Sequence, residues 1–340
     1  MTFEVYSAEE KDKWSGILSR MHAFDFYHTY SYNLYYSDGS CKPVLCYFHS
    51  NNVEIVLPII VRNISGTLYK DVTSAYGYVG PLSSKFPIES EYLEHFLISL
   101  DTFFNENNIV SVFSRLHPSL NNDLIISKRG TVIPLSETVF IDLTKNIDEQ
   151  RSHFKKGVKS DLSKLTKNGY YVMQDSNLTY VHEFISIYNE NMKRVGARKG
   201  YYFDNKYYDF LFRSDDIDAR LYFVLKDGIK IATSIFVFTG KIIQYHLSGT
   251  RNEYLKNSPV SLLIDHVRRI GTQMKYDEMH LGGGVGSARD SLFNYKAGFS
   301  NCRHHFKVWK YIVDKQKYDE LVSLKKDFGD LNYFPLYRSV

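Results

Sequence analysis

Residues 281–300 read Leu-Gly-Gly-Gly-Val-Gly-Ser-Ala-Arg-Asp-Ser-Leu-Phe-Asn-Tyr-Lys-Ala-Gly-Phe-Ser, and they decide how the second half of the chain folds. The preceding residues 276–281 alternate in polarity as a short strand does, and the glycines then permit a sharp turn. Ser287 and Asp290 have the spacing of a capping box, which predicts a helix from Ala288. Gly298 is expected to end this helix, and its expected buried positions are Leu292, Tyr295 and Phe299.

Residues 306–313 alternate again, so the unit reads strand, glycine loop, helix, strand. Backbone amides at a glycine turn and at a helix start bind anions, so the loop is a candidate site for a phosphate or a developing oxyanion. Lys296 adds a positive charge. The loop matches neither G-x-G-x-x-G with a following acidic residue nor G-x-x-x-x-G-K-[ST], and a plain tight turn remains the alternative. The candidate residues of the loop are Gly283, Gly284, Gly286 and Ser287.

The composition indicates a globular protein with two domains. The chain has 340 residues, of which 44% are hydrophobic and 24% charged, and it is unusually rich in Tyr and Phe, with 28 and 23 residues. Aromatic faces suit polar organic ligands as well as cores. The net charge of +4 permits a phosphorylated or nucleic-acid partner without requiring one.

Three cysteines without C-x-x-C spacing fit a reducing compartment and predict neither a disulfide framework nor a zinc site. The N-terminal residues lack the pattern of a secretion signal, and no 18-residue stretch is strongly apolar and uncharged. We therefore expect a cytoplasmic protein without a membrane span and without a bound metal.

The first half reads as strands and helices, with an aromatic turn at residues 74–82 that contains Tyr76. The strand that begins at residue 109 leads into Arg115 and His117, and Pro118 ends it. This places both side chains at the carboxyl edge of a sheet, where α/β proteins gather ligands. A single histidine there is more often structural, so both interpretations remain open.

A helix is expected over residues 147–165, with a face rich in lysine. Such a face is either simply solvated or a contact for phosphates. The lysines and arginine of this segment are Arg151, Lys155, Lys156, Lys159, Lys164 and Lys167.

The second half continues with a helix over 181–193 and three strands at 219–226, 229–239 and 241–248. Asp227-Gly228 predicts a type I′ hairpin between the first two strands, and Gly271 is expected to end the helix that starts near Ser258-Pro259. Each half thus ends in a meander and a strand-helix-strand closure. We predict an α/β protein with mixed sheets, made of two similar domains at residues 1–145 and 146–313. Residues 314–340 are expected to pack back on the first domain.

Several motifs, in order, resemble the FemA/FemB/FemX transferases and their GNAT-like relatives. They are Tyr245-His246-Leu247-Ser248-Gly249-Thr250, Asn257-Ser258-Pro259, the glycine loop, and Phe293-Asn294-Tyr295-Lys296-Ala297-Gly298-Phe299. Weaker matches are Ile141-Asp142-Leu143, Met192-Lys193-Arg194 and residues 115–118. The resemblance spans about residues 76 to 312 and implies two GNAT-like domains that make amide bonds.

The resemblance also implies roles for individual residues. Tyr295 and Lys296 match the aromatic-lysine pair that steadies the acyl donor or its tetrahedral intermediate. Arg198, Tyr202 and Tyr245 match positions that hold the phosphates of the acceptor's nucleotide. Arg115 and Tyr76 are further substrate-binding candidates in the first half.

Three departures from the family pattern indicate a short relative with a different acceptor. Residues 28–38 lack the family's lysine near a tryptophan, His117 stands where FemX-like members carry an aspartate, and no long helical hairpin is inserted. We expect no permanently bound cofactor, and acyl-CoA or aminoacyl-tRNA as co-substrate.

Amide synthesis needs an acceptor for the amine proton and donors for the oxyanion. The candidates for the proton acceptor are His117, His246 or a tyrosine, and weaker candidates are Glu253 and Asp265. The candidate donors to the oxyanion are Lys296 and the loop amides. No serine lies in a nucleophile-elbow sequence and no cysteine has a nearby histidine in the sequence, so no covalent enzyme intermediate is expected.

Three functions follow from these patterns. The preferred one transfers an acyl group from CoA to the amine of an amino sugar or nucleotide-linked precursor of a cell-envelope glycan. The first alternative is aminoacyl transfer from tRNA to a peptidoglycan precursor, and the second is an inactive module that binds a glycan or partner.

Overall fold

A computed structural model gives the structure of residues 1–37 and 40–339. Within these residues the chain forms two compact units. Unit 1 contains residues 1–135 and 305–340, and unit 2 contains residues 136–304. The sequence places its domain boundaries about ten residues later at both points, at 145/146 and 313/314, and these boundaries stay a prediction.

Unit 1 is built on the strand order β1-β2-β3-β4-β6-β13, with β5 beside β3. The strands are β1 (Thr2–Tyr6), β2 (Cys41–His49), β3 (Glu54–Asn63), β4 (Lys70–Thr73), β5 (Leu82–Ser83), β6 (Ile109–Leu116) and β13 (Cys302–Ile312). The helices are α1 (Lys11–Leu18), η1 (Phe26–His28), α2 (Tyr30–Tyr35), α3 (Ser90–Glu106), α4 (Asp123–Ile126), α11 (Lys315–Ser323) and η5 (Leu336–Arg338). β1 to β4 pair in antiparallel fashion, whereas β4 and β6 run parallel.

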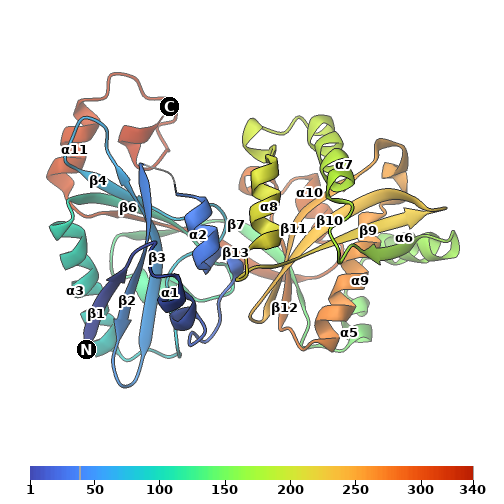
Figure 1. Ribbon diagram of the computed structural model, residues 1–340, viewed down its shortest axis with the longest axis horizontal. Helices are drawn as coiled ribbons and strands as arrows, with labels where there is room; N and C mark the ends of the chain where they lie inside the picture. Colours follow the sequence, from blue (N-terminus) through green and yellow to red (C-terminus); the bar gives the residue numbers. More distant parts are fainter. Residues whose placement is uncertain (38–39, 340) are drawn as a thin grey trace. The chain divides into compact units, whose positions relative to one another are not determined.

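Unit 2 repeats this order as β8-β9-β10-β11-β12-β7. The strands are β7 (Thr131–Asp142), β8 (Tyr171–Gln174), β9 (Asp218–Lys226), β10 (Ile229–Thr239), β11 (Ile242–Thr250) and β12 (Glu278–Gly282). The helices are α5 (Ile147–Ser152), α6 (Lys156–Lys167), α7 (Val181–Arg194), η2 (Lys199–Tyr201), α8 (Asn205–Arg213), η3 (Asn252–Asn257), α9 (Val260–Gln273), η4 (Val285–Ser287) and α10 (Ser291–Lys296). Figure 1 shows both sets of elements.

The two units share one topology. In each, four antiparallel strands lead through a helix, α3 or α9, to a parallel fifth strand, and an antiparallel sixth strand follows. The sixth strand of each unit comes from the other half of the sequence: β13 completes unit 1 and β7 completes unit 2. Two similar α/β lobes were predicted from the sequence, but this exchange of strands was not.

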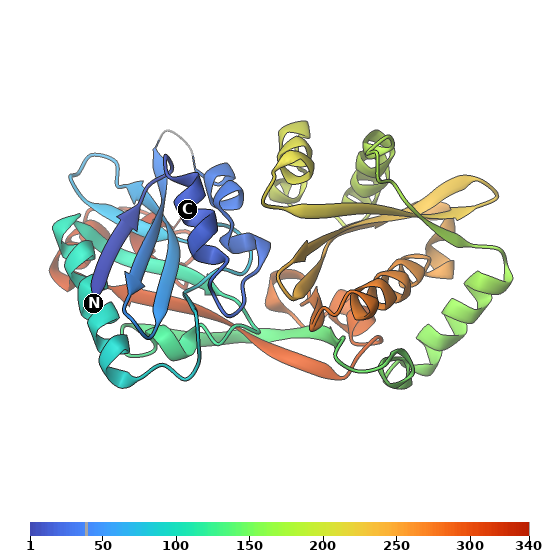
Figure 2. The same cartoon turned by 60° about the horizontal axis from the view of Figure 1, so that its bottom comes forward.

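In unit 2 the sheet lies between two layers of helices. Figure 2 shows α7 and α8 on one face of strands β9 to β11 and α9 on the other. The helix α9 buries Leu263, Ile264 and Val267 against Tyr222, Phe236 and Ile243 of the sheet, because its apolar residues recur at helical spacing. Unit 1 has an equivalent core, in which α3 contributes Phe96, Leu97 and Leu100.

Three details of the predicted helices are wrong. The helix expected over 147–165 is broken between α5 and α6, where Lys155 is extended and its amide donates to Gly298 at 2.9 Å. Gly271 does not end α9, which runs to Gln273. A Cβ at Gly271 would instead meet Ile243 and Leu143, so this glycine allows α9 to approach the sheet closely.

The third error concerns the helix after the glycine loop. It begins at Ser291 rather than Ala288, because Asp290 is the cap: its carboxylate accepts from the amide of Phe293 at 2.9 Å. The shift changes which side chains face inward. Leu292 is exposed, while Phe293 and Lys296 are buried.

Candidate active site

The parallel pairing of β11 and β12 ends early, and we call the unpaired end of the two strands the gap. Registered pairs run only from Ile242/Glu278 to Gln244/His280, although both strands continue beyond. The pairing of β11 with β10 skips His246, which is therefore a bulge residue. A bulge bends its strand, and the gap lies at the carboxyl ends of parallel strands, where ligands of open sheets bind.

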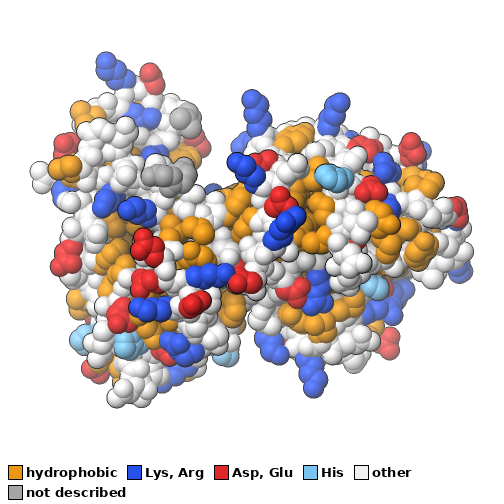
Figure 3. Space-filling model, viewed as in Figure 1, with side chains coloured by type: hydrophobic (Ala, Val, Ile, Leu, Met, Phe, Trp, Pro, Cys, Tyr) orange, Lys and Arg blue, Asp and Glu red, His pale blue; other side chains and the backbone are white. Residues whose placement is uncertain are grey.

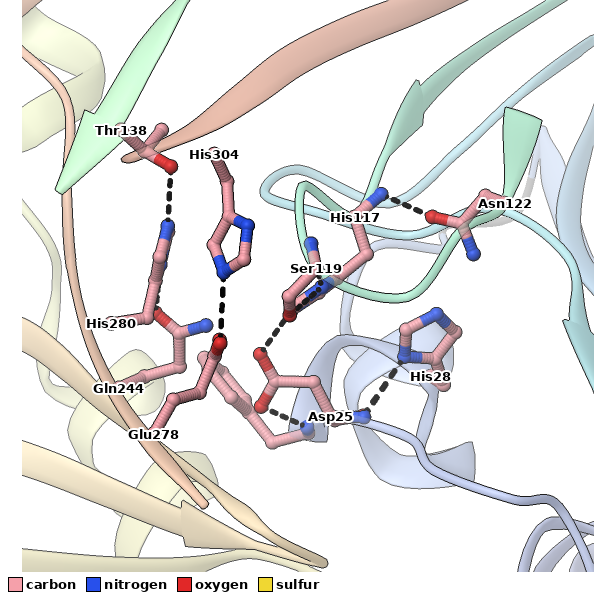
Figure 4. A network of polar contacts seen from close by, with 11 residues as sticks. Asp25, His28, His117, Ser119, Asn122, Thr138, Gln244, Glu278, His280 and His304 are labelled. Carbon is pink, nitrogen blue, oxygen red and sulfur yellow. Dashed lines mark hydrogen bonds and ion pairs between the residues drawn. The ribbon is translucent and has the colours of Figure 1, made fainter. Parts of the chain in front are cut away.

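A buried polar bridge closes the base of this gap. His280 Nδ1 lies 2.9 Å from Gln244 Oε1, and His280 Nε2 lies 2.9 Å from Thr138 Oγ1 (Figure 4). These three side chains join β11, β12 and β7, and all are buried. The sequence patterns did not predict these three residues, although a histidine between Met279 and Leu281 of a buried strand is a usable signal.

Lys296 reaches into this region from α10. Its Nζ donates to the carbonyl oxygen of Gly283 at 2.8 Å and lies 5.9 Å from the centre of the Tyr245 ring. The side chain is 8% exposed, and burial lowers its pKa to about 8, against a smaller opposing effect of Asp290. A buried ammonium group thus lies between the end of β12 and the bulged part of β11.

Two tyrosines and His246 complete the group. Burial raises the pKa of Tyr245 to about 12 and that of Tyr295 further, so both phenols stay protonated at neutral pH. The Tyr245 hydroxyl is hydrogen-bonded to Ser248. We call Tyr245, His246, Gly283, Tyr295 and Lys296 the β11/β12 site.

His246 is held by a residue that the sequence did not indicate. Its Nε2 lies 2.5 Å from the hydroxyl of Tyr207, which α8 supplies, and burial lowers the pKa of His246 to about 4. The imidazole is therefore neutral at pH 7. Tyr207 lies in a helix with several aromatic residues, and the sequence does not distinguish a hydrogen-bond partner of His246 from the residues that fill the core.

The glycine loop is organised by Asp290. Its carboxylate accepts from the amides of Val285 and Phe293, which lower its pKa although burial acts in the opposite direction. Gly286 and Ser287 adopt left-handed backbone angles, with φ of 60° and 67°. Asp290 thus takes the place at the helix start where we expected a bound anion. Anion binding by Gly283, Gly284, Gly286 and Ser287 stays a prediction.

No family model matches the sequence, and no curated protein matches it either. Among solved structures, FemX has a TM-score of 0.73 at 13% identity, with 94% of this chain and 99% of FemX covered. The C-terminal domain (DUF2156) of a putative lysylphosphatidylglycerol synthetase from Agrobacterium fabrum has a TM-score of 0.57 at 12% identity. The match covers 89% of this chain and 92% of that domain. L-PGS from Bacillus licheniformis has a TM-score of 0.56 at 14% identity, with 90% of this chain and 93% of L-PGS covered.

The chain has a FemX-like fold. This confirms the predicted α/β architecture of two GNAT-like units and the resemblance to the FemA/FemB/FemX group at the level of fold.

Within this FemX-like fold, Lys296 of unit 2 contacts Gly283 of the glycine loop and lies near Tyr245, whereas His246, the next residue of β11, contacts Tyr207 of α8. The predicted acceptor residues Arg198 and Tyr202 lie elsewhere, exposed in the connection from α7 to α8. Among the described residues, no hydrogen bond or ring contact joins either of them to Lys296.

The weaker candidates for the base have other positions. Asp265 is engaged by Arg268 and Arg269 within α9, and Glu253 is exposed on η3.

The remaining candidates of the FemX-like fold lie in unit 1. The Arg115 guanidinium lies 5.3 Å from the ring centres of both Tyr76 and Phe113, so two of the predicted residues are in contact. His117 is buried and bonded to Asp25 at 3.0 Å.

In unit 1 the pairing of β4 with β6 ends at Val72 and Val112, and a later segment pairs with the end of β6. Val79 forms a bridge to Leu116, and the Asn122 carboxamide contacts both His117 and Pro81.

No helix among the described residues is long and apolar enough to cross a membrane, and these residues contain no group of three acidic, His or Cys side chains suited to a metal ion.

Proposed function

We propose that the protein is an acyl- or aminoacyltransferase that forms an amide bond at the β11/β12 site of unit 2. The observation that carries this proposal is Lys296, a buried ammonium group held at 2.8 Å from Gly283 at the unpaired end of two parallel strands. A FemX-like fold supports the reaction class.

Lys296 suits the stabilisation of an oxyanion. When an amine attacks an acyl carbonyl, negative charge develops on the carbonyl oxygen, and a charged donor in a desolvated site stabilises it strongly. With a pKa of about 8, Lys296 is largely protonated at pH 7. It exchanges its bond to Gly283 for one to the oxyanion, while the neutral phenols of Tyr245 and Tyr295 line the site.

The proton of the attacking amine needs an acceptor, and His246 is our candidate. Its imidazole is neutral at pH 7 and is oriented by Tyr207. A base with a pKa of about 4 is weak, so it accepts the proton only once the amine has become an acidic ammonium in the tetrahedral intermediate. Most of the barrier reduction then comes from holding the two reactants together.

We propose acyl-CoA as the donor, and as acceptor the amine of an amino sugar or similar precursor of a cell-envelope glycan. Arg198 and Tyr202 are exposed, as residues that hold an incoming polar acceptor must be. We propose that they hold its phosphates or sugar, with Arg115 and Tyr76 as further contacts. The reaction then belongs in the cytoplasm, where CoA esters are available.

Aminoacyl-tRNA is the alternative donor, and one observation favours it. Four lysines of the α6 region are exposed and form no ion pair among the described residues; they are Lys155, Lys156, Lys164 and Lys167. Unpaired lysines suit a phosphate backbone. Figure 3 shows, however, that Lys and Arg side chains are scattered among acidic ones over the face in view and do not form one continuous basic patch there.

The first experiment measures the thermal midpoint of the protein with acetyl-CoA, free CoA, aminoacyl-tRNA and uncharged tRNA. A ligand at 100 times its Kd adds about 2.7 kcal/mol to the stability of the folded state. A shift with the CoA compounds alone supports the acyl-CoA donor, and a shift with charged tRNA that disappears at high salt supports the alternative. No shift with any of them favours an inactive binding module.

The second experiment tests Lys296 in the transfer itself. Lys296→Met should abolish transfer from the donor that binds, because the oxyanion loses its charged donor. Lys241→Met is the matched control: Lys241 is exposed, also donates to a backbone carbonyl, that of Lys275 at 3.0 Å, and lies in the same unit. Undiminished transfer by Lys296→Met would contradict the assignment of the site.

A further inference from the structure

Unit 1 contains a chain of polar contacts that links an aspartate, a histidine and a serine. Asp25 Oδ2 lies 3.0 Å from His117 Nε2, and His117 Nδ1 lies 3.1 Å from the hydroxyl oxygen of Ser119 (Figure 4). The residues come from distant parts of the sequence, since Asp25 caps η1 and the other two follow β6.

The backbone fixes the tautomer of His117. The amide of Ser119 donates to His117 Nδ1 at 3.3 Å, and an amide is always a donor. Nδ1 therefore carries the lone pair, and Nε2 carries the proton and donates it to Asp25. The Ser119 hydroxyl oxygen, at 3.1 Å, shares this one lone pair with the amide, and the hydroxyl proton takes it when the longer amide contact opens. This is the arrangement in which a histidine removes a proton from a serine while an aspartate orients it.

The surroundings hold this arrangement rigidly. The side chains of Asp25 and His117 are both 0% exposed, and the second oxygen of Asp25 accepts from the amide of Phe26 at 2.7 Å. The His117 amide donates to Val79 O at 2.8 Å and to the Asn122 carboxamide. Ser119 itself is only partly buried. A buried pair behind a reachable hydroxyl is what a nucleophilic serine requires.

We propose that Ser119, His117 and Asp25 form a second reactive centre, which hydrolyses esters or thioesters by way of an acyl-serine. Ser119 Oγ attacks the carbonyl carbon and its proton passes to His117 Nδ1. The C–O or C–S bond then breaks, and the leaving alcohol or thiol takes that proton. Water attacks the acyl-serine by the same route, which releases the carboxylic acid and restores Ser119. This activity does not depend on the transfer proposed for unit 2.

The test uses the whole protein and two probes. A fluorophosphonate is added first, and the modified residue is located by peptide mass spectrometry. Hydrolysis of p-nitrophenyl acetate is then measured for the wild type, Ser119→Ala, Asp25→Asn and the control Ser127→Ala, which alters an exposed serine of the same unit. Thermal midpoints verify that each variant is folded.

We expect one phosphonate adduct per chain, on Ser119, which is lost in Ser119→Ala and strongly reduced in Asp25→Asn. Hydrolysis should fall to the background of buffer in Ser119→Ala and stay at the wild-type rate in Ser127→Ala. A wild-type protein without an adduct on Ser119, or hydrolysis that survives Ser119→Ala, overturns the proposal. Ser119→Cys provides a second check, because a nucleophilic position should then react with iodoacetamide faster than Cys41 does.

Discussion

Lys296 Nζ donates a hydrogen bond of 2.8 Å to the carbonyl oxygen of Gly283, and this contact ties α10 to the end of β12. The glycine loop between them presents a carbonyl, rather than an amide, to the buried cation. Its helix start is occupied by the chain's own Asp290. The positive charge of the β11/β12 site is therefore carried by one side chain, and its protonation is the first property to test.

Stability should rise with pH through the titration of Lys296. Burial lowers the pKa of this lysine from its ordinary value of 10.5 to about 8 in the folded protein. Between these values the unfolded chain binds more protons, so raising the pH favours the folded state. From pH 7 to 9.5 the stability of the wild type relative to Lys296→Met should increase by about 2 kcal/mol. Urea unfolding of both proteins at each pH measures the difference.

The control for this measurement is Lys241→Met, because Lys241 is exposed. Its stability relative to the wild type should stay constant over the same pH range. A constant difference for Lys296→Met as well would mean that the Lys296 ammonium group is not desolvated in the folded protein.

Gly284→Ala should disrupt the glycine loop. A Cβ at this position would overlap the carbonyl oxygen of Ala288 and the carboxylate of Asp290, so the loop must move and Asp290 must leave its cap. We expect a loss of about 1–3 kcal/mol in stability and a loss of the thermal shift caused by the donor. Gly157→Ala is the control. Its Cβ meets nothing within 4 Å, and it lies in α6, where alanine stabilises by up to about 1 kcal/mol.

Tyr207→Phe should free the His246 ring. The variant loses the hydroxyl that bonds to Nε2, at a cost of about 1 kcal/mol in stability, and the ¹⁵N shifts of the His246 ring should change. Tyr208→Phe is the neighbouring control on the same helix. Its hydroxyl is buried and lacks a hydrogen-bond partner among the described residues, so its removal should not destabilise the protein. Equal costs in both variants would contradict the His246 contact.

The sequence predicted the elements of the fold well where periodicity and turn chemistry agree. Asp227 and Gly228 both have positive φ, as the predicted hairpin requires, and Lys226 pairs with Ile229 across the turn. The predicted start of α10 was wrong because Ser287 and Asp290 are both residue types that cap helices well. Which one caps depends on the left-handed backbone at Gly286 and Ser287, and local sequence does not determine that.

The sites were harder to predict, because their contacts join residues far apart in the chain. Lys296 and Tyr245 were predicted from motifs, whereas the contacts of Tyr207 and His280 depend on the pairing of strands and on helix packing. The exchange of β7 and β13 was hidden for the same reason. A strand's alternation shows that it pairs, but not with which neighbour it pairs.

Arg268 should be the most sensitive charged residue of unit 2. It is 0% exposed, and its guanidinium donates to Asp265 Oδ1 at 2.6 and 2.9 Å and to Gln150 Oε1 at 3.0 Å, which joins α9 to α5. Arg268→Met leaves Asp265 short of a buried partner and should cost about 3 kcal/mol, measured by urea unfolding. Adding Asp265→Leu should recover part of this loss, because the unpaired carboxylate is then gone.

Arg213→Met provides the comparison for Arg268→Met. Arg213 pairs with Asp209 on the surface of α8, where the two side chains are 80% and 65% exposed, so its loss should cost less than about 0.5 kcal/mol. If Arg268→Met were equally mild, water would have to reach Asp265 in the variant. The double variant with Asp265→Leu would then be less stable than Arg268→Met alone, since it would give up a hydrated carboxylate and its bond to Arg269.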